Sequence, residues 1–455
     1  MVSGDIIKDA SWTDTCKDHP SIANHFLVRQ YLIQPAKDLV EFLRRLQGPP
    51  NAELLLLVFD EVAALLPRNT YERYFALRRV VAMLKDLPIW SFFLSTLSNA
   101  KFLPPFDGVE RSDRITQKKE TPTEPFLALP LDVVASNALQ TGYEAELDKS
   151  MSEFATAKHM AMFGRPLWRA YREDPVSLRY LAQTKILCAS TFDPGNANQV
   201  FATMASRLCL DVCMEHDNAF ALSSEAVNSH LRIALSISPV CLSTTTPSEP
   251  VVSEAVAGLL CDGLRGGSNW PASIHTLSSE LFSRGLVDKG HKGELFARLL
   301  CVLARDLHLT KAKRKDSNFP YAEPFTVQDF LGSLSNGRFL DDIMRCTPAA
   351  ATVNTRFSGE PKETLPLSTV FDGGHLNFTH FTSTDRDLES TTMSDLLHNL
   401  IRQQAALQLA FRQDDWDLLI PVYFGNMDQA FDPSRLGNSH PGEKSSETVQ
   451  SVRRC

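Results

Sequence analysis

The apolar run Leu54–Phe59, followed directly by Asp60 and Glu61, constrains the fold of this chain more than any other stretch. A strand that is covered on both faces needs no alternation of apolar and polar side chains, so we expect this run to be a buried strand of a parallel sheet. Polar groups would then stand at its carboxyl end. A core strand that leads into a helix would show the same pattern, because acidic side chains are favoured in the first turn of a helix.

A second apolar segment, residues 88–96, supports the parallel sheet. A helical pattern over residues 62–84 separates the two segments, and two strands joined by one helix form a right-handed crossover unit. In a P-loop nucleoside triphosphatase an Asp holds Mg²⁺, the next Glu activates water, and a polar residue on the neighbouring strand senses the terminal phosphate. Asp60, Glu61 and Thr96 are the candidates for these three roles, with Ser98 as the alternative to Thr96.

Seven sequence motifs extend the pattern along the chain: FDEVAALLP at 59–67, RYFALRRVVAML at 73–84, FFLSTLSNAKFLPPF at 92–106, FGRPLW at 163–168, GLVDKGHKGELFARLLCVLARD at 285–306, NFTHF at 377–381 and WDLLIPVYFG at 416–425. They resemble a group of large fungal proteins related to the crinkler effectors, in which a P-loop ATPase is fused to a PD-(D/E)xK nuclease-like domain. The resemblance covers most of residues 50–434. It implies an α/β chain with an incomplete P-loop-like parallel sheet, a helical region and an incomplete nuclease-like domain. It also implies that Arg165 belongs to the lid of the ATPase module.

One essential part of a P-loop ATPase is missing from this sequence. A glycine-rich loop with Lys and Ser or Thr must precede the Asp-Glu strand to hold the phosphates, but the only glycines before Asp60 are Gly4 and Gly48. Positioning of the triphosphate supplies much of phosphoryl-transfer catalysis. The resemblance implies Mg²⁺ and ATP as cofactors, and the missing loop weakens that expectation. We therefore expect a domain that is truncated or degenerate.

The resemblance places a second set of acidic residues in the C-terminal half. Glu294 stands in the first turn of an amphipathic helix, with an expected core face at residues 295, 296, 299, 300 and 303. A strand within residues 375–381, a helix over 393–411 and a strand over 416–423 follow. In PD-(D/E)xK nucleases, carboxylates from a helix and two strands converge on Mg²⁺.

In the family pattern Glu294 and Asp417 match the metal ligands of the nuclease-like domain, as Asp60 does in the ATPase. Each residue also fits a structural role, because a Glu in the first turn stabilises a helix and a strand Asp is often exposed. After Asn438 the chain is polar and lacks the strand that carries an acidic or Gln residue and a Lys in the family. We expect this domain to be truncated too.

These patterns divide the chain into five parts. They are a helical N-terminal segment (1–50), a partial P-loop NTPase-like domain (51–175), a helical region with a linker (176–265), a partial nuclease-like α/β domain (266–425) and a divergent, disordered tail (426–455). The main boundary is expected between the Ser-, Thr- and Pro-rich stretch 244–250 and the break at 263–269.

The composition is that of an ordinary globular protein, with 43% hydrophobic and 22% charged residues. With a formal charge of −8, binding of nucleic acid would need locally clustered Lys and Arg. Nine scattered cysteines suit a reduced compartment, and we see no signal peptide or apolar run of membrane-spanning length. We expect an intracellular protein, cytoplasmic or nuclear, with nucleic acid or protein as partner and no membrane contact.

The favoured function is that of an inactive or truncated relative of the ATPase and nuclease-like proteins. The alternative is a noncatalytic helical scaffold or protein-interaction module, in which both sheets are kept only for packing.

Overall fold

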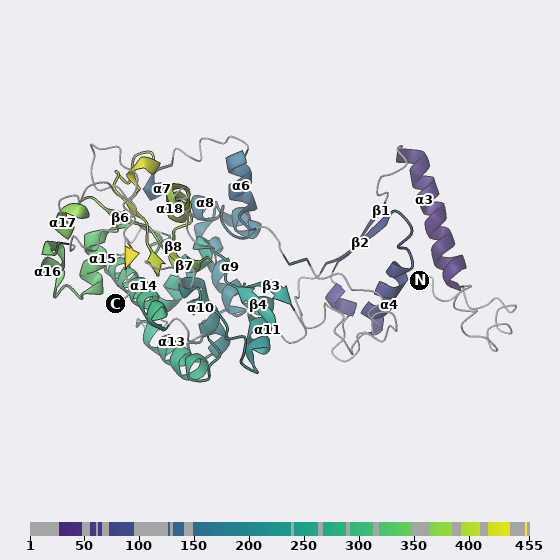
Figure 1. Ribbon diagram of the computed structural model, residues 1–455, viewed down its shortest axis with the longest axis horizontal. Coiled ribbons are helices and arrows are strands. Elements are labelled where there is room, and N and C mark those ends of the chain that lie inside the picture. Colours follow the sequence, from purple (N-terminus) through teal and green to yellow (C-terminus); the bar gives the residue numbers. More distant parts are fainter. Residues whose placement is uncertain are drawn as a thin grey trace. The chain divides into compact units, whose positions relative to one another are not determined.

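The chain forms two compact units, Met1–Thr123 and Glu124–Cys455 (Figure 1). The computed structural model describes residues 27–47, 55–60, 62–65, 72–94, 126–127, 131–140, 149–237, 241–262, 267–287, 292–312, 318–347, 365–384, 393–409, 417–436 and 451–452. The FGRPLW motif, the 244–250 stretch and the break at 263–269 all fall within the second unit.

The first unit contains a small parallel sheet. Its elements are η1 (Arg29–Ile33), α3 (Gln34–Gln47), β1 (Leu55–Phe59), η2 (Val62–Leu65), α4 (Glu72–Ala82) and β2 (Ile89–Phe93). Strands β1 and β2 pair in parallel, with Leu55 opposite Ile89 and Phe59 opposite Phe93. The expected parallel pairing is confirmed. The Phe59 and Phe93 rings stack with centroids 5.1 Å apart, and Tyr74 of α4 meets Phe93 edge-on at 5.8 Å.

The expectation that this strand is covered on both faces is wrong. Burial alternates along β1 and β2, and the side chains of Leu56, Val58 and Trp90 are 58%, 53% and 55% exposed. Phe59 and Phe93 point the other way, toward Tyr74 of α4 and Val62 of η2. Among the described residues, helical cover therefore lies on one face of this sheet, and the other face is apolar and open.

The second unit is a mixed α/β structure in which helices predominate, which confirms the expected α/β class. Its helices are α6 (Val133–Gln140), α7 (Met151–Phe154), α8 (Ala157–Met160), η5 (Pro166–Tyr171), α9 (Pro175–Leu187), α10 (Ala197–Leu208), α11 (Ala219–Ser229), α12 (Pro250–Cys261), α13 (Trp270–Thr276), η6 (Leu277–Phe282), α14 (Lys292–Ala312), α15 (Val327–Leu334), α16 (Leu340–Arg345), α17 (Leu367–Val370), α18 (Met393–Arg402) and η9 (Pro433–Arg435). Its strands are β3 (Ile233–Ile237), β4 (Leu242–Thr245), β5 (Phe325–Thr326), β6 (His375–Leu376), β7 (His380–Ser383), β8 (Ala405–Gln408), β9 (Leu418–Leu419), β10 (Val422–Tyr423) and β11 (Ser451–Val452).

Helix α12 lies at the centre of the main core. It is buried along nearly its whole length, and α9, α10 and α14 pack against it. Pro250 occupies its first turn, where a missing N–H costs nothing. The stretch expected as a connector thus contains β4 and the start of the central helix.

A four-stranded mixed sheet, in the order β11-β9-β8-β7, packs between two apolar clusters. Strands β7 and β8 are parallel, and the β8-β9 and β9-β11 pairs are antiparallel. Along β9, Leu418 packs in the main core and Leu419 in a second cluster that contains Met151, Phe154 and Leu400. Because side chains alternate along a strand, each face of the sheet serves one of these clusters.

Two expected elements of this region differ from the structure. The helix expected over 393–411 ends at Arg402, and residues 405–408 form the buried strand β8 after Gln404 takes a left-handed conformation (φ 51°). The strand expected over 416–423 is split into β9 and β10, which belong to different sheets. Pro421 lies between them and lacks the N–H that a continuous ladder would need.

Part of the expected tail is folded. Phe431 and Leu436 are buried in the second cluster, and Phe431 stacks on Tyr423 with ring centroids 4.7 Å apart. Ser451 and Val452 form β11, the edge strand beside β9. The sequence showed no strand pattern there, because a two-residue strand is too short to show a period.

Helix α14 confirms the expected amphipathic helix but buries a different face. Leu295 and Leu299 are buried as expected, whereas Phe296 and Leu300 are 61% and 55% exposed. The buried face instead includes Val302 and three charged residues, Arg298, Arg305 and Asp306. None of the described helices is long and apolar enough to cross a membrane.

Candidate functional site

Asp60 directly follows β1, at the carboxyl end of the parallel β1-β2 pair, and its side chain is exposed. Two residues after Asp60, the chain contacts the end of β2. The Val62 backbone N–H donates to the Leu94 carbonyl oxygen at 3.0 Å. Outside the described residues lie the other candidates of this module, which are Glu61, Thr96 and Ser98.

The carboxyl ends of β7 and β8 form a polar edge of the second unit. Ser383 and Gln408, the last residues of these two parallel strands, lie opposite each other in the sheet. Ligands of α/β proteins commonly bind at the carboxyl ends of parallel strands. Strand β9 runs antiparallel to β8, so its first residues, next to Asp417, lie along the same edge.

Glu294 reaches this edge from α14. It stands in the first turn of the helix, where a carboxylate is favoured by the positive helix end. Its Oε2 accepts a hydrogen bond from Gln408 Nε2 at 2.9 Å, which connects the start of α14 to the end of β8. The structure therefore places the predicted helix acid beside the sheet.

Asp417 shares the edge with Glu294 but not the face of the sheet. The Leu409 N–H donates to the Asp417 carbonyl oxygen at 3.0 Å, so the β8-β9 ladder continues to this residue. Leu418 packs in the main core on the α14 side, and alternation assigns the Asp417 side chain to the opposite face, with Leu419. Glu294 and Asp417 therefore do not form one ligand set for Mg²⁺ in this arrangement.

Arg298, one turn after Glu294, secures the end of α10 at the same edge. Its Nη1 donates to the carbonyl oxygens of Leu208 and Cys209, which end that helix. Cys209 Sγ lies 3.3 Å from Ser383 Oγ, and burial raises the pKa of this thiol. These groups connect elements of the fold, and a thiol that resists ionisation is a poor nucleophile.

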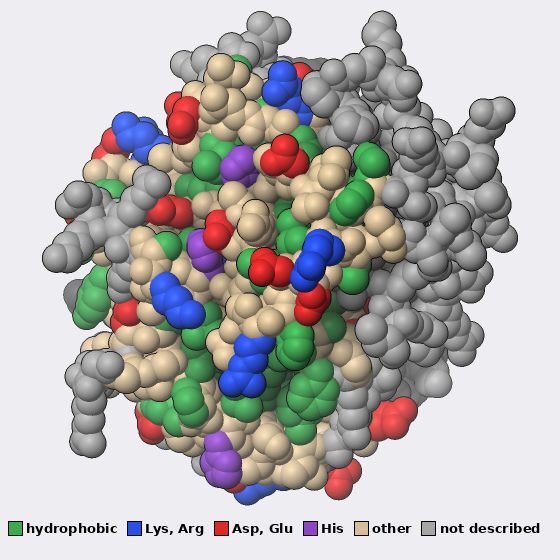
Figure 2. Space-filling model, turned by 90° about the vertical axis from the view of Figure 1, so that its left-hand side faces the viewer, with side chains coloured by type: hydrophobic (Ala, Val, Ile, Leu, Met, Phe, Trp, Pro, Cys, Tyr) green, Lys and Arg blue, Asp and Glu red, His purple; other side chains and the backbone are tan. Residues whose placement is uncertain are grey.

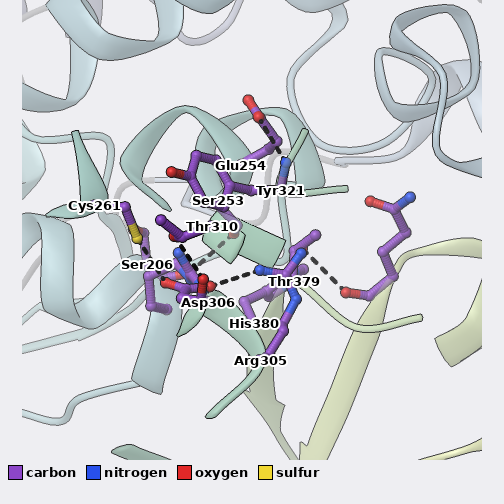
Figure 3. A network of polar contacts seen from close by, with 12 residues as sticks. Ser206, Ser253, Glu254, Cys261, Arg305, Asp306, Thr310, Tyr321, Thr379 and His380 are labelled. Carbon is purple, nitrogen blue, oxygen red and sulfur yellow. Dashed lines mark hydrogen bonds and ion pairs between the residues drawn. The ribbon is translucent and has the colours of Figure 1, made fainter. Parts of the chain in front are cut away.

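A second polar cluster, deeper in the unit, was not identified from the sequence (Figure 3). Asp306 Oδ1 accepts hydrogen bonds of 2.7 Å from Arg207 Nη2 and from Arg305 Nη1, and all three side chains are almost fully buried. Cys261 Sγ lies 3.7 Å from Asp306 Oδ2. Burial, and then this carboxylate, raise the pKa of the Cys261 thiol to about 12.

Glu254 of α12 extends this cluster. It is fully buried and pairs with Arg179 of α9 at 3.6 Å, and its Oε1 accepts from the Tyr321 N–H at 3.4 Å. Burial raises the pKa of Glu254, and Arg179 opposes that rise. The available sequence signal was weak: Arg305 and Asp306 interrupt the mainly apolar stretch 295–309, but neither belongs to the core face expected from its hydrophobic pattern.

His380 of β7 forms the arrangement most similar to a catalytic pair. Thr379 Oγ1 donates to the Gln404 carbonyl oxygen at 3.1 Å, so it accepts from His380 Nδ1, 2.8 Å away. Nε2 is then the acceptor for the Ser248 hydroxyl, also at 2.8 Å. A serine beside a histidine is the usual geometry of an activated nucleophile.

The surroundings of His380 do not suit a general base. Burial, followed by the Arg207 and Arg305 guanidinium groups, lowers its pKa to about 3. A proton taken from Ser248 would create a buried imidazolium beside two cations. The partner of His380 Nδ1 is the Thr379 hydroxyl, and not a carboxylate that would stabilise the imidazolium. We therefore assign the pair a positioning role between β7 and the start of α12.

The FGRPLW motif is held by two carboxylates, the half-buried Asp132 and the buried Glu249. Asp132 Oδ1 accepts from the Gly164 N–H at 2.5 Å, and Glu249 Oε1 accepts from the Arg165 N–H and from Trp168 Nε1, both at 2.8 Å. The Arg165 guanidinium pairs with Glu249 and donates to the Leu231 carbonyl oxygen at 2.7 Å. Arg165 is thus used within the second unit, next to the start of α12.

Among the residues that the structure describes, no group of three or more His, Cys, Asp or Glu side chains is arranged to hold a metal ion.

Comparison with known families matches residues 197–345 to a family model described as a domain of unknown function (DUF8736). This stretch is shorter than half the chain. It runs from α10 to α16 and contains Glu294 and the Arg207, Glu254, Arg305 and Asp306 cluster, whereas His380, Gln408 and Asp417 lie beyond it. No curated protein and no solved structure matches the chain.

Proposed function

We propose that this protein is a noncatalytic relative of the crinkler-type ATPase and nuclease-like proteins, and that its second unit serves as a scaffold. The observation that carries the proposal is the Glu294–Gln408 hydrogen bond of 2.9 Å. The acid that the family resemblance assigns to a metal is used here to join α14 to β8. The buried charged groups around Asp306 and Glu249 likewise join helices to one another.

A surface with mixed charges fits a scaffold for protein partners better than a nucleic-acid groove. Figure 2 shows acidic and basic side chains interspersed among the described residues of one face. Phosphate binding requires Lys and Arg to be gathered.

A metal-dependent nuclease is the second candidate, with Mg²⁺ held by acidic groups at the carboxyl end of β8. It is favoured by one observation, that Glu294 and Asp417 lie along one edge of one sheet. In this case a rotation of the residue before β9 would have to bring the Asp417 carboxylate to the α14 side.

Calorimetric titration of the full chain with Mg²⁺ and Mn²⁺, followed by a cleavage assay on single- and double-stranded nucleic acid, separates the two candidates. For a scaffold we expect neither binding nor cleavage up to about 10 mM metal, a range in which weak carboxylate sites fill. Metal-dependent cleavage that disappears in both Glu294→Gln and Asp417→Asn would establish the nuclease instead.

Thermal unfolding of two variants tests the structural role of Glu294 directly. Glu294→Leu removes the acceptor of the Gln408 amide, so we expect it to lower stability by about 1 to 2 kcal/mol. Asp417→Asn keeps the backbone carbonyl that Leu409 uses and a side chain of nearly the same shape, so its loss of stability should be smaller. Equal effects of the two substitutions would contradict the scaffold role of Glu294.

Whether the first unit binds nucleotide is tested by titrating the full chain with Mg²⁺-ATP beside Asp60→Ala. We expect no binding by either protein. Binding in the micromolar range that is lost in Asp60→Ala would restore the ATPase interpretation of the first unit.

A further inference from the structure

Helix α3 presents a stripe of apolar side chains to solvent. Leu39, Phe42 and Leu46 are 42%, 57% and 66% exposed. A neighbouring side of the helix packs within the protein, since Val40, the residue after Leu39, is buried. An apolar stripe of this kind on an otherwise charged helix marks an interaction surface.

The spacing of the stripe suits another helix. With Pro35, its members in α3 stand at residues 35, 39, 42 and 46, so the steps alternate between four and three. This is the seam of a helix that packs against a helix, in which each side chain fits between side chains of the partner. An ideal helix of the length of Gln34–Gln47 is about 21 Å long, enough for two such repeats.

The charged residues beside the stripe favour pairing with α3 of a second copy, with the two helices antiparallel. Asp38 and Arg45 flank the same side of the seam, seven residues apart. When two copies of the helix cross head to tail, equivalent flanks face each other, so Asp38 of each copy meets Arg45 of the other. In a parallel pair this flank would face Leu43 instead, and the charges would have no counterpart.

The contacts that Asp38 and Arg45 make within α3 are weak enough to be exchanged for contacts with a second copy. Gln34 Nε2 donates to Asp38 Oδ1 at 2.9 Å, and Arg45 pairs with Glu41 at 2.6 Å. All these contacts are within the helix and exposed to solvent, where such contacts contribute little.

We propose that α3 is a self-association helix, which pairs antiparallel with α3 of a second copy through Leu39, Phe42 and Leu46, with Asp38 and Arg45 as the matching charges. This inference goes beyond the scaffold function and does not depend on it. A single pair of short helices buries a small area, so the association is reversible and depends on protein concentration.

Sedimentation velocity of the full chain, at concentrations from about 1 to 100 µM, tests the proposal over the range expected for a weak dimer. We expect a monomer–dimer equilibrium in the native protein. Phe42→Asp should weaken it at least about tenfold, a change easily resolved on this concentration scale. Val176→Asp is the matched control, because Val176 of α9 is 68% exposed and lies in the other unit.

Charge reversal separates a direct contact between Asp38 and Arg45 of two copies from an effect of the substitutions on the stability of the helix. Asp38→Arg and Arg45→Asp each place like charges opposite each other, so each should weaken association several-fold. The two substitutions combined restore opposite charges and should restore association. A chain that stays monomeric over the whole range, or a combined variant as weak as the single ones, would overturn the proposal.

Discussion

Asp306 is the only carboxylate within hydrogen-bond reach of both Arg207 and Arg305 among the described residues. Both guanidinium groups are almost fully buried, and several of their nitrogen atoms make no hydrogen bond in this structure. A buried ion pair is a weak source of net stability, but removal of one partner leaves a charge in a medium that solvates it poorly. Asp306 therefore adds little net stability to the fold, but its removal would cost much stability, because two buried guanidinium groups would lose their carboxylate.

We expect Asp306→Asn to lower the free energy of unfolding by about 3 to 5 kcal/mol, the usual cost of breaking a buried pair. Urea unfolding followed by circular dichroism measures this loss. Asp342→Asn is the control, since Asp342 forms a 2.8 Å pair with Arg345 in which both side chains are more than 70% exposed. A loss of similar size in the control would show that burial is not the cause.

At the scale of elements, the packing of α9 on α12 depends on one glycine. A Cβ atom on Gly258 would overlap the guanidinium of Arg179, the cation that pairs with buried Glu254. The side chain of Arg179 could move aside, but Glu254 would then lose its cation. The close approach of the two helices and the neutralisation of Glu254 therefore require the same small residue.

We expect Gly258→Ala to lower stability by about 1 to 3 kcal/mol, the usual range for overpacking a core. Gly293→Ala in α14 should have no such effect, because nothing lies within 4 Å of its added Cβ and alanine is the better helix former. Thermal unfolding of the two variants compares them. A midpoint for Gly258→Ala at or above that of the native protein would contradict this account of the α9–α12 contact.

The elements that the sequence predicted correctly are those with a long period or a long apolar run. The parallel β1-β2 pair and helix α14 belong to this group. Strand β8 was missed because Ala405–Gln408 follows a helix without a break in composition, and only pairing with β7 makes it extended. The buried face of α14 was missed because a hydrophobic pattern cannot select Arg305 and Asp306 as core residues.

The candidate site could be predicted only in part for a related reason. Glu294 was correctly placed in the first turn of a helix, but its partner Gln408 stands 114 residues later, in the unpredicted strand. The FGRPLW motif was noted for its family resemblance, and nothing local in the sequence indicated that Glu249 would bind it.

At the scale of the whole second unit, buried histidines should make the fold sensitive to acid. Burial lowers the pKa of His159 and of His380 from 6.5 to about 3. Below pH 6.5 the unfolded chain therefore binds protons that the folded chain does not, so this contribution to stability is complete above pH 6.5 and is lost as the pH falls toward 3. Glu249 and Glu254 act in the opposite sense, because burial raises their pKa and the folded chain takes up their protons first.

We expect the free energy of unfolding to fall between about pH 6.5 and 5, by up to about 1.4 kcal/mol per pH unit for each buried histidine. Urea titrations at several pH values measure this slope. In a variant with His159→Gln and His380→Gln the slope should be clearly smaller, whatever the absolute stability. An unchanged slope would assign the acid sensitivity to other groups.

The Arg207, Arg305 and Asp306 cluster also limits how this protein can change over evolutionary time. Because the three side chains depend on one another, a substitution at any one of them is harmful until the others change as well. Apolar replacement of a whole buried triad can be neutral or stabilising. Relatives of this chain should therefore carry either all three charged residues or none, with few intermediates.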